Sequence, residues 1–400
     1  MVSTQVVVIG GGLTGISTAY HLARNGYNVV VLERRGVASE ASGVNAGSIG
    51  SIGCGLKPDL TSTLQTGSMR IISQLQSDYG FDIEFRQCGG LQAIHTLNEY
   101  DFAKKRVSKL KNNGYSLELL SSREAKELEP EVNIELPGYI YSPVHAQVNP
   151  QKLTLALAAK SVEYGAIILT GEELRSIYLN GTDSYQMETQ RSKISCEILI
   201  IAAGAWSKSI GRMLSLNIPI IPIRGQMWAM KSSTIHLSHV ISSLESYYHW
   251  HTHPGNTTIS PPNLTHIEGA RVTRHLYGRQ TRSGEIIFGG DRQSAEFNKT
   301  PEDSGIKANK HHATQVIPAL KDHRISRTWG GLMPFTMDGI PIIGKVAQSK
   351  NLYINTGLGP NGLAQGTMAG KLLSDVILTD QYPKILSSAS PDRCITPVNN

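Results

Sequence analysis

The sequence predicts an α/β protein in which one domain is assembled from several separate stretches of the chain. Apolar, β-branched runs that end at glycine-rich turns occur near the start, in the middle and near the end of the 400 residues. Helical patterns follow the first and the last of these runs, as expected beside a parallel sheet. Between them lie short alternating segments with turn residues, which are typical of antiparallel sheets. We therefore expect a discontinuous Rossmann-like domain and a second, α+β domain rich in antiparallel strands.

The first 35 residues predict a strand, a tight turn, a helix and a second strand. An apolar run, Val6–Ile9, stops at a glycine triplet, and a helical pattern then extends from Leu13 to about Asn25. A second apolar run, Val29–Leu32, follows and ends on an acidic residue. This order of elements is that of the unit that binds dinucleotides.

The glycines of the turn have the spacing Gly10-x-Gly12-x-x-Gly15. Gly10 permits the sharp turn, Gly12 lets backbone amides approach a diphosphate, and Gly15 lets the helix pack closely on the strand. The helix N-terminus adds about half a positive charge that faces the phosphates. Glu33 is placed to accept hydrogen bonds from an adenosine ribose, which argues against the 2′-phosphate of NADP.

The remaining elements follow in order. Further helices are expected at about Leu60–Tyr79, Glu99–Asn112, Gln151–Tyr164 and Asn361–Leu378, and strands at Gly90–His95, Ala166–Leu169, Glu197–Ala203 and Asn351–Asn355. The stretch Ile218–Phe297 alternates between apolar segments and turn signals, so it reads as a sheet-rich region.

The order of these elements predicts a domain organisation with two interruptions. The nucleotide-binding domain is expected to comprise residues 1–84, 145–215 and 322–385, the substrate domain residues 85–144 and 216–321, and a C-terminal tail residues 386–400. A simple NAD dehydrogenase usually completes its dinucleotide fold in one block, so the interruptions favour a flavoprotein.

Composition excludes some classes of function. The net charge is +6 and the densest basic run, Lys104–Lys111, has no interleaved aromatic residues, which argues against binding to nucleic acid. The four cysteines form no CxxC pair, as expected in a reducing compartment. No signal peptide or membrane span is apparent, so we expect a cytoplasmic protein without a membrane span.

The chain resembles the FAD-dependent family that includes glycine oxidase, D-amino-acid oxidase and dehydrogenase, and sarcosine oxidase. Five segments in the same order carry the resemblance, which covers nearly the whole length: Gly10–Arg34, Ala41–Gly47, Ala202–Trp206, Trp329–Gly344 and Thr356–Leu363. The resemblance implies FAD as the cofactor. It also implies non-covalent attachment, because no cysteine stands near Gly330–Met333 and Asn45 stands where a histidine carries the flavin in dimethylglycine-dehydrogenase-like members.

The resemblance also implies which residues contact FAD. They are Gly10, Gly12, Leu13, Thr14, Gly15, Glu33, Arg34, Ala41, Ser42, Asn45, Ala46, Gly47, Ser48, Leu174, Ala203, Gly204, Trp206, Gly331, Gly357, Gly359, Pro360, Asn361, Gly362 and Leu363. In this set, Leu174 is expected to meet the adenine through its backbone. The loop before the last helix brings backbone amides to the N1–C2=O edge of the flavin, where reduction places negative charge.

Three residues are predicted on the substrate side: Tyr277, Arg279 and Met333. Tyr277 falls where glycine-oxidase-like members have a tyrosine that lines the substrate pocket. Strand alternation puts Tyr277 and Arg279 on one face, so Arg279 is expected to bind a substrate carboxylate through its fork of donors.

The sequence departs from the amino-acid oxidase pattern at two positions. Met333 stands where those members usually have an arginine, and Pro360 stands where glycine-oxidase-like members have another. Either Arg279, Arg224 or Arg327 then binds the carboxylate, or the substrate is a bulkier, less acidic amine that packs on Met333.

The expected function is oxidation of the C–N bond of an amine or amino acid to an imine, with hydride transfer to flavin N5. The expected partners are a small amine substrate, an electron acceptor (oxygen, a quinone or a protein), and further copies or a second kind of subunit. One alternative is a 2-hydroxy-acid or polyol-phosphate dehydrogenase with a base in His249–His253. Another is a flavin-bearing subunit of an electron-transfer complex. His249, His251 and His253 are expected on one face of an extended segment, but no acid or cysteine alongside completes a metal site.

Overall fold

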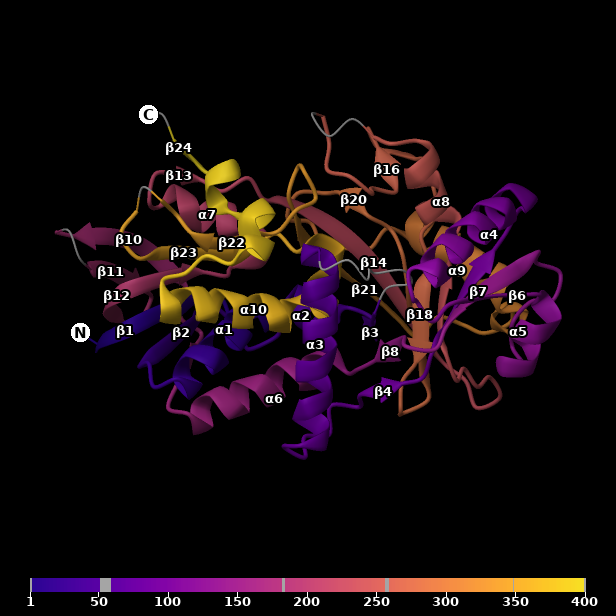
Figure 1. Ribbon diagram of the computed structural model, residues 1–400, viewed down its shortest axis with the longest axis horizontal. Coiled ribbons are helices and arrows are strands. Elements are labelled where there is room, and N and C mark those ends of the chain that lie inside the picture. The colour runs from indigo at the N-terminus through magenta and orange to yellow at the C-terminus, as the bar shows by residue number, and fades with distance from the viewer. Residues whose placement is uncertain (1, 51–58, 182–183, 256–258, 348, 399–400) are drawn as a thin grey trace.

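The computed structural model describes residues 2–50, 59–181, 184–255, 259–347 and 349–398. Two large sheets lie next to each other along the longest axis, and both ends of the chain lie near the first sheet (Figure 1). No helix in the described ranges is both long and apolar enough to cross a bilayer.

The first sheet has a parallel centre. Strands β1 (Val2–Ile9), β2 (Val29–Glu33), β9 (Ile167–Thr170), β12 (Lys193–Ile201) and β23 (Leu352–Thr356) run parallel to their neighbours, and β10 (Leu174–Asn180), β11 (Ser184–Thr189) and β22 (Ile342–Lys345) pair antiparallel. Segments from the start, the middle and the end of the chain therefore meet in one sheet.

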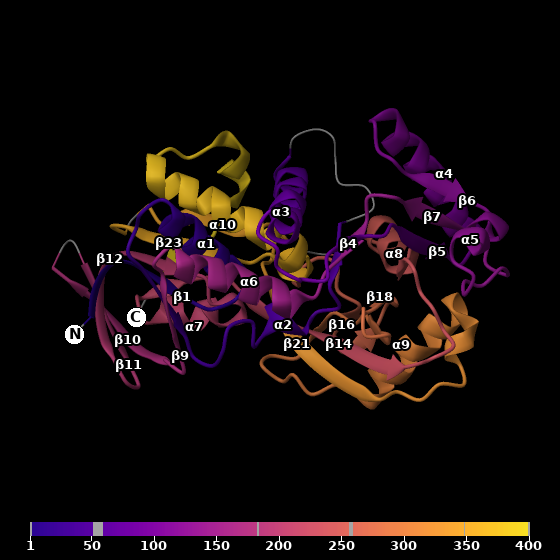
Figure 2. The ribbon, with the colours of Figure 1, turned by 90° about the horizontal axis from the view of Figure 1, so that it is seen from below.

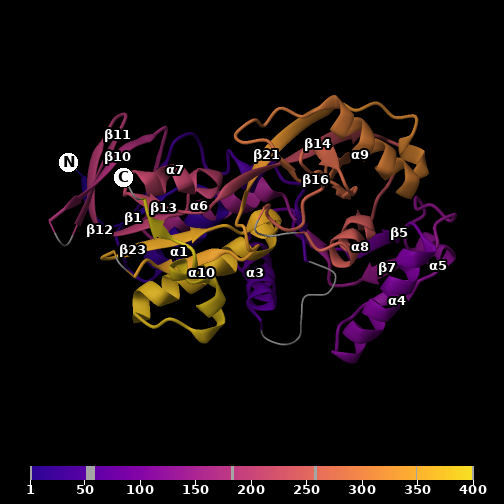
Figure 3. The same cartoon turned by 90° about the horizontal axis from the view of Figure 1, so that it is seen from above.

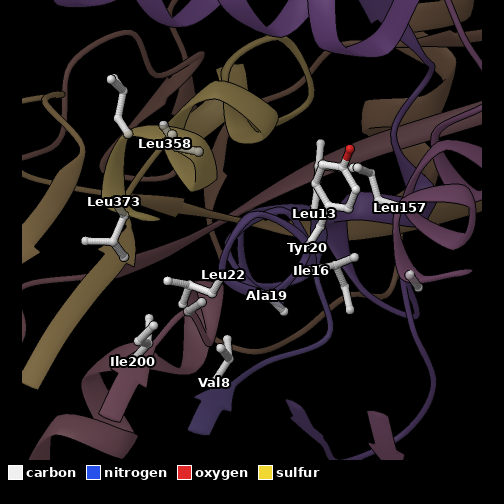
Figure 4. Close-up of a cluster of buried hydrophobic side chains, with 14 of the residues drawn as sticks. Val8, Leu13, Ile16, Ala19, Tyr20, Leu22, Leu157, Ile200, Leu358 and Leu373 are labelled. Carbon is white, nitrogen blue, oxygen red and sulfur yellow. The ribbon is translucent and has the colours of Figure 1, made fainter. Parts of the chain in front are cut away.

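Side chains from both faces of this sheet are buried. Val6 and Val8 of β1 pack into a cluster with helices α1 (Leu13–Arg24), α3 (Leu60–Ser77), α6 (Pro150–Glu163) and α10 (Gly362–Thr379) (Figure 4). Val7 and Ile9 alternate to the opposite face and join a second cluster with β10 to β12. This burial on both sides explains why the strands read as continuous apolar runs.

The second sheet is almost wholly antiparallel. It comprises β5 (Gly90–Ile94), β6 (Glu118–Leu120), β7 (Gly138–Ser142), β14 (Ile221–Lys231), β15 (Val240–Ser243), β18 (Tyr277–Gln280), β19 (Glu285–Gly289), β20 (Gln293–Ser294) and β21 (Arg327–Phe335). Among the described strands of this sheet, only β5 and β15 pair in parallel. Helices α4 (Leu97–Asn112), α5 (Ser122–Leu128), α8 (Glu245–Thr252) and α9 (Asp303–Val316) accompany it.

The remaining elements are short. They are α2 (Ala41–Val44), α7 (Ser207–Arg212), β3 (Ser48–Ile49), β4 (Arg86–Gln87), β8 (Ala146–Gln147), β13 (Leu216–Asn217), β16 (His266–Ile267), β17 (Ala270–Arg271) and β24 (Thr396–Pro397), with 3-10 turns at Gly204–Trp206, Pro318–Leu320, Gly359–Asn361, Lys384–Ala389 and Pro391–Arg393. Among them, β13 pairs with β24, β16 pairs with β17, and β8 pairs with β3 and β4.

The structure agrees with the predicted α/β fold class, and three further observations concern the predicted segments. Strand β21 lies within the stretch assigned to the nucleotide-binding domain, yet it pairs with β14 of the second sheet (Figure 3). The predicted tail is packed, since Leu386 is fully buried and β24 pairs with β13. The predicted extended segment around His249 is helix α8. Three cysteines are free thiols, and Cys54 lies outside the described residues.

Helices α1 and α10 cross at small residues. A Cβ at Gly370 would lie 2.6 Å from Ser17 Oγ and 2.7 Å from the backbone nitrogen of Thr18. At this crossing the Ser17 hydroxyl donates to the carbonyl of Thr367 at 2.7 Å. The close approach fixes where the N-terminal ends of both helices lie.

We predict that Gly370→Ala lowers the free energy of unfolding by about 1–3 kcal/mol, because the added methyl overpacks the crossing. Urea unfolding of the purified protein measures this change. Gly36→Ala is the control, because a Cβ there meets nothing within 4 Å. Equal stability of the two variants would contradict the packing described.

Candidate active site

A cavity of about 520 Å³ lies between the two sheets, at the carboxyl ends of β1, β2 and β12. This volume is typical of sites for cofactors and small ligands, and ligands of open α/β sheets bind outside the carboxyl ends of the strands. Every residue predicted to contact the cofactor lines this cavity except Gly15 and Ala46.

Those two residues lie behind the lining and support it. A Cβ at Gly15 would lie only 2.1 Å from the carbonyl oxygen of Gly10, so the helix can approach the turn only with glycine here. Ala46, within the loop Asn45–Ser48, is fully buried.

The turn after β1 brings the backbone to the cavity wall. Gly10 has a φ of +116°, and a Cβ there would lie 2.5 Å from the carbonyl oxygen of Ala202. Glu33 ends β2, and its carboxylate accepts hydrogen bonds from the amides of Gly11 and Arg35, both at 2.8 Å. The two amides fix the orientation of this carboxylate, and Glu33 lines the cavity.

A flat wall closes the cavity near β10. The guanidinium carbon of Arg34 lies 3.8 Å from the centre of the Trp206 ring, and Arg34 also pairs with Glu40 at 2.9 Å. Leu174, the first residue of β10, lines the same end. A stacked arginine and indole beside an apolar side chain suit a planar, aromatic group.

Two helix N-termini point into the cavity. Neither α1 nor α10 receives a hydrogen bond from the side chain of its own N-cap residue, and neither has an acidic residue in its first turn. By contrast, Asp59, Thr96 and Asn149 cap α3, α4 and α6. A helix start that lacks a local cap and an acid is suited to an anion.

The loop Ala41–Ser48 is anchored to the start of α1. The Ser42 hydroxyl accepts a hydrogen bond from the amide of Leu13 at 2.9 Å. A Cβ at Gly12 would lie 3.1 Å from the same hydroxyl oxygen. The loop and the helix start therefore form one side of the cavity, lined largely by small residues.

On the side of the second sheet, Tyr277 and Met333 line the cavity and Arg279 does not. Arg279 is 3% exposed, and its Nε donates to the carbonyl of Ala46. Its guanidinium instead lines a second cavity, of about 280 Å³, beside Glu84 and Arg86. Tyr277 and Arg279 do share a face of β18, but the loop at Ala46 and Gly47 lies between Arg279 and the main cavity.

The other two arginines suggested by the sequence, Arg224 and Arg327, form ion pairs outside the main cavity. Arg224 is buried, donates to the carbonyl of Thr300 at 2.8 Å and pairs with Glu302. Arg327 pairs with Glu285 at 2.7 Å. Neither lines the main cavity.

Arg292, which sequence reasoning missed, lines the cavity beyond the end of β19. Its guanidinium carbon lies 4.5 Å from the centre of the Trp250 ring, and its Nη2 lies 3.1 Å from Nε2 of His275. Within the described residues no carboxylate pairs with it. Burial lowers the pKa of Arg292 to about 10, so it remains charged at neutral pH. The signal in the sequence was its place directly after Gly289-Gly290-Asp291, where a strand ends beside the predicted pocket.

His275 holds Arg292 and is itself neutral. Because the guanidinium can only donate, Nε2 of His275 accepts, and Nδ1 therefore donates to the Ser246 hydroxyl at 2.7 Å. Burial, together with the charge of Arg292, places the pKa of His275 well below its ordinary value.

The histidine segment, which was expected to be extended, is helical: His249 and His251 lie in helix α8, and His253 follows its last residue. The rings of His249 and His253 stack with their centres 4.8 Å apart, whereas the rings of His251 and Tyr247 are tilted, with their centres 4.0 Å apart. None of these three histidines lines the cavity, and the described residues contain no group of three metal-ligating side chains. The helix contributes Tyr247 to the lining, and Trp250 supports Arg292.

The chain is similar to known proteins along nearly its whole length. The family described as "DAO: FAD dependent oxidoreductase" matches residues 5–376. The chain is 28% identical over 406 residues to sarcosine oxidase subunit beta of Arthrobacter sp, covering 98% of this chain and 91% of that protein. It is 25% identical to the mitochondrial dimethylglycine dehydrogenase of Mus musculus, covering 97% of this chain but only 44% of that protein's length.

Solved structures show the same fold. Glycine oxidase from Geobacillus kaustophilus superposes with a TM-score of 0.84 at 22% identity, covering 99% of this chain and 100% of that one. L-proline dehydrogenase from P. horikoshii superposes with a TM-score of 0.82 at 24% identity, covering 98% of each chain. Since the family match spans nearly the whole sequence and the cavity has the features of a dinucleotide site, the chain belongs to the family of FAD-dependent oxidoreductases.

Proposed function

We propose that this protein oxidises the carbon–nitrogen bond of an amine that carries a carboxylate, with non-covalent FAD as the hydride acceptor. The observation that carries the proposal is Arg292: a charged guanidinium without a described carboxylate partner, at the end of the cavity formed by the second sheet. Arg292 is partly buried, and a cation that has lost part of its hydration favours an anion beside it; a substrate carboxylate fits its fork of donors.

The lining fits FAD along its length. Glu33 would bind the adenosine ribose, and Arg34, Trp206 and Leu174 would surround the adenine. The N-terminus of α1 would face the diphosphate, and that of α10 would face the flavin ring. When bound, the flavin supplies the acceptor for a hydride from the substrate carbon, and water hydrolyses the resulting imine.

The residues opposite the flavin would position the substrate. Arg292 would bind the carboxylate in two hydrogen bonds, and neutral His275 would keep the guanidinium in place. Tyr277, whose hydroxyl lies 3.5 Å from Met227 Sδ, would form an apolar wall for alkyl groups with Met227 and Met333. This positioning would fix the reacting C–H bond against the flavin.

Neither histidine of the described lining is available as a general base, which favours an amine over a hydroxy acid as the substrate. Oxidation of a hydroxyl needs a base, and both ring nitrogens of His275 are engaged while its pKa is lowered. The other lining histidine, His145, shares a hydrogen bond with the Ser48 hydroxyl at 2.8 Å, and burial lowers its pKa to about 4. An amine that binds in its neutral form needs no such base.

Anaerobic reduction of the purified holoenzyme tests this proposal. We expect α-amino acids or N-alkyl amino acids to bleach the visible absorbance of the flavin, and amines without a carboxylate to do so far more slowly. Bleaching by hydroxy acids alone would overturn the amine assignment. A protein that never binds a yellow cofactor would overturn the flavin assignment.

We predict that Glu33→Gln weakens FAD binding by about 10-fold, because an amide loses the charge-assisted bonds from Gly11 and Arg35. Fluorescence titration of the apoprotein with FAD measures the change. Glu197→Gln is the control, because Glu197 is an exposed residue of β12 that does not line the cavity. Equal affinity of the two variants would argue against a ribose at Glu33.

We further propose that the protein acts in the cytoplasm and assembles with copies of itself or with a second kind of chain. The free thiols Cys88, Cys196 and Cys394 support a reducing compartment. One relative is by name a subunit, which supports a hetero-complex. Mass measurement of the natively isolated protein distinguishes these assemblies, and a lone monomer would contradict both.

A further inference from the structure

We infer that the second cavity is a binding site for a small phosphate dianion, either inorganic phosphate or a phosphate monoester. Residues of α3, β4, β8 and β18 line this cavity, whose volume is about 280 Å³. That volume lies just below the range typical of ligand sites, so the cavity suits a small molecule. None of its described lining residues belongs to the main cavity, so the inference goes beyond the proposed function.

The central cation of the second cavity is Arg279. It is 3% exposed, and among the described residues only its Nε has a hydrogen-bond partner, the carbonyl oxygen of Ala46. The guanidinium packs on the backbone of Gly47, since a Cβ there would lie 2.8 Å from Nη2. Burial lowers the pKa of Arg279 to about 10, so the side chain is charged at neutral pH. A buried cation costs free energy unless an anion joins it.

The carboxylates of the second cavity are paired with other cations. Glu84 favours the charged form of Arg279 but forms its ion pair with Lys152, at 2.9 Å. Asp82 pairs with Arg282 at 2.9 Å and with Lys152 at 3.4 Å. The terminal nitrogens of Arg279 therefore remain available to a ligand in the cavity.

The ionic groups in and beside this cavity carry a surplus of two positive charges. Four cations stand against two carboxylates: Arg86, Arg279, Arg282 and Lys152 against Asp82 and Glu84. A phosphate dianion balances this surplus, whereas a single carboxylate balances half of it. The planar fork of a guanidinium also matches the geometry of phosphate oxygens.

The walls of the second cavity are held by bonds within the protein. In Figures 1 and 2, β4 lies between α3 and β18. Arg86 of β4 lies opposite Gln147 of β8 in the register of their small sheet. The side-chain amide of Gln76 in α3 donates to the carbonyl of Phe85 at 3.0 Å and accepts from its backbone amide at 2.9 Å. The cavity is therefore formed before a ligand arrives, which limits the ordering that binding requires.

Calorimetric titration of the holoenzyme tests this inference, with inorganic phosphate and methyl phosphate as the probes. The titrations are run at constant ionic strength and at pH 8, where both probes are mainly dianions. An excess of methoxyacetate is present, because this carboxylate should occupy the main cavity and keep the probes away from Arg292. We expect binding of both probes. Tighter binding of methyl phosphate would identify the ligand as an ester, and tighter binding of inorganic phosphate would identify it as the free ion.

We expect Arg279→Met to raise the dissociation constant of the tighter probe by about 10- to 100-fold, and Arg279→Lys to restore part of the affinity. Arg86→Met changes an exposed residue at the same cavity and should weaken binding by about 2- to 10-fold. Its matched control is Arg123→Met, an exposed arginine of α5 outside both cavities, which should bind as the wild type does.

Two results would overturn the inference. One is a wild-type protein that binds neither probe. The other is an unchanged dissociation constant in Arg279→Met or, if that variant does not fold, equal dissociation constants in Arg86→Met and Arg123→Met.

Discussion

Replacement of Arg292 by methionine is expected to raise the dissociation constant of a carboxylated amine by about 10- to 100-fold, the equivalent of one charged hydrogen-bonding group at about 1.5–3 kcal/mol. The variant removes the guanidinium that lies over Trp250, together with its hydrogen bonds to His275 and to the carbonyl of Asn263 and the donors available to a ligand in the cavity. Rapid-reaction measurements of flavin reduction give the dissociation constant and the limiting rate separately. We expect a larger change in the dissociation constant than in the limiting rate, because Arg292 would bind the carboxylate and not the carbon that is oxidised.

Arg327→Met is the matched control, because Arg327 pairs with Glu285 away from the cavity. It should leave substrate affinity within about twofold of wild type, as surface substitutions usually do. A large loss of affinity in Arg279→Met, with little change in Arg292→Met, would show that the substrate carboxylate binds at Arg279 and not at Arg292. The assignment of the cavity would then be wrong.

Acid is expected to destabilise the protein strongly between pH 6.5 and pH 5. Burial is the main cause that lowers the pKa of His21 to about 3, of His95 and His145 to about 4, and of His312 to about 2, and it places that of His275 well below its ordinary value. These histidines are neutral in the folded protein, whereas the unfolded chain binds protons at a pKa of about 6.5. Their contribution to stability is therefore fully present above pH 6.5 and is lost as the pH falls toward the folded values.

Each histidine that titrates independently costs about 1.4 kcal/mol per pH unit in this range. His95 and His312 lie 3.1 Å apart, so their contributions do not simply add. The sum is several kcal/mol by pH 5, which is a large part of the stability of a typical domain. Urea unfolding at pH 5, 6, 7 and 8 measures it, and His21→Asn should make the dependence shallower. A stability that stays constant from pH 7 to pH 5 would contradict the burial of these rings.

The strand, turn and helix at the start of the chain could be predicted from the sequence because their signals are local, whereas most other residues of the proposed cofactor site were implied by the resemblance to known proteins. The turn at Gly10 and Gly15 needs residues without a Cβ, and the acid at Glu33 follows a strand of recognisable length. These requirements concern residues that are close together in the sequence, so their spacing predicts the geometry of this turn.

The substrate side was less predictable because it depends on contacts between distant segments. Whether Arg279 or Arg292 reaches the cavity depends on the loop at Ala46, more than 200 positions away along the chain. Likewise, no local sequence pattern indicates that β21 pairs with β14. The alternating histidines at 249–253 fit a strand, and only the packing of Tyr247 and Trp250 in the fold reveals a helix.

The most direct test is a crystal structure of the holoenzyme with methoxyacetate, a carboxylate that cannot be oxidised as an amine. We predict FAD along the main cavity, with its ribose at Glu33, and the carboxylate within hydrogen-bonding distance of Arg292. A carboxylate bound to Arg279 in the second cavity, or a main cavity that excludes FAD, would contradict the proposed site.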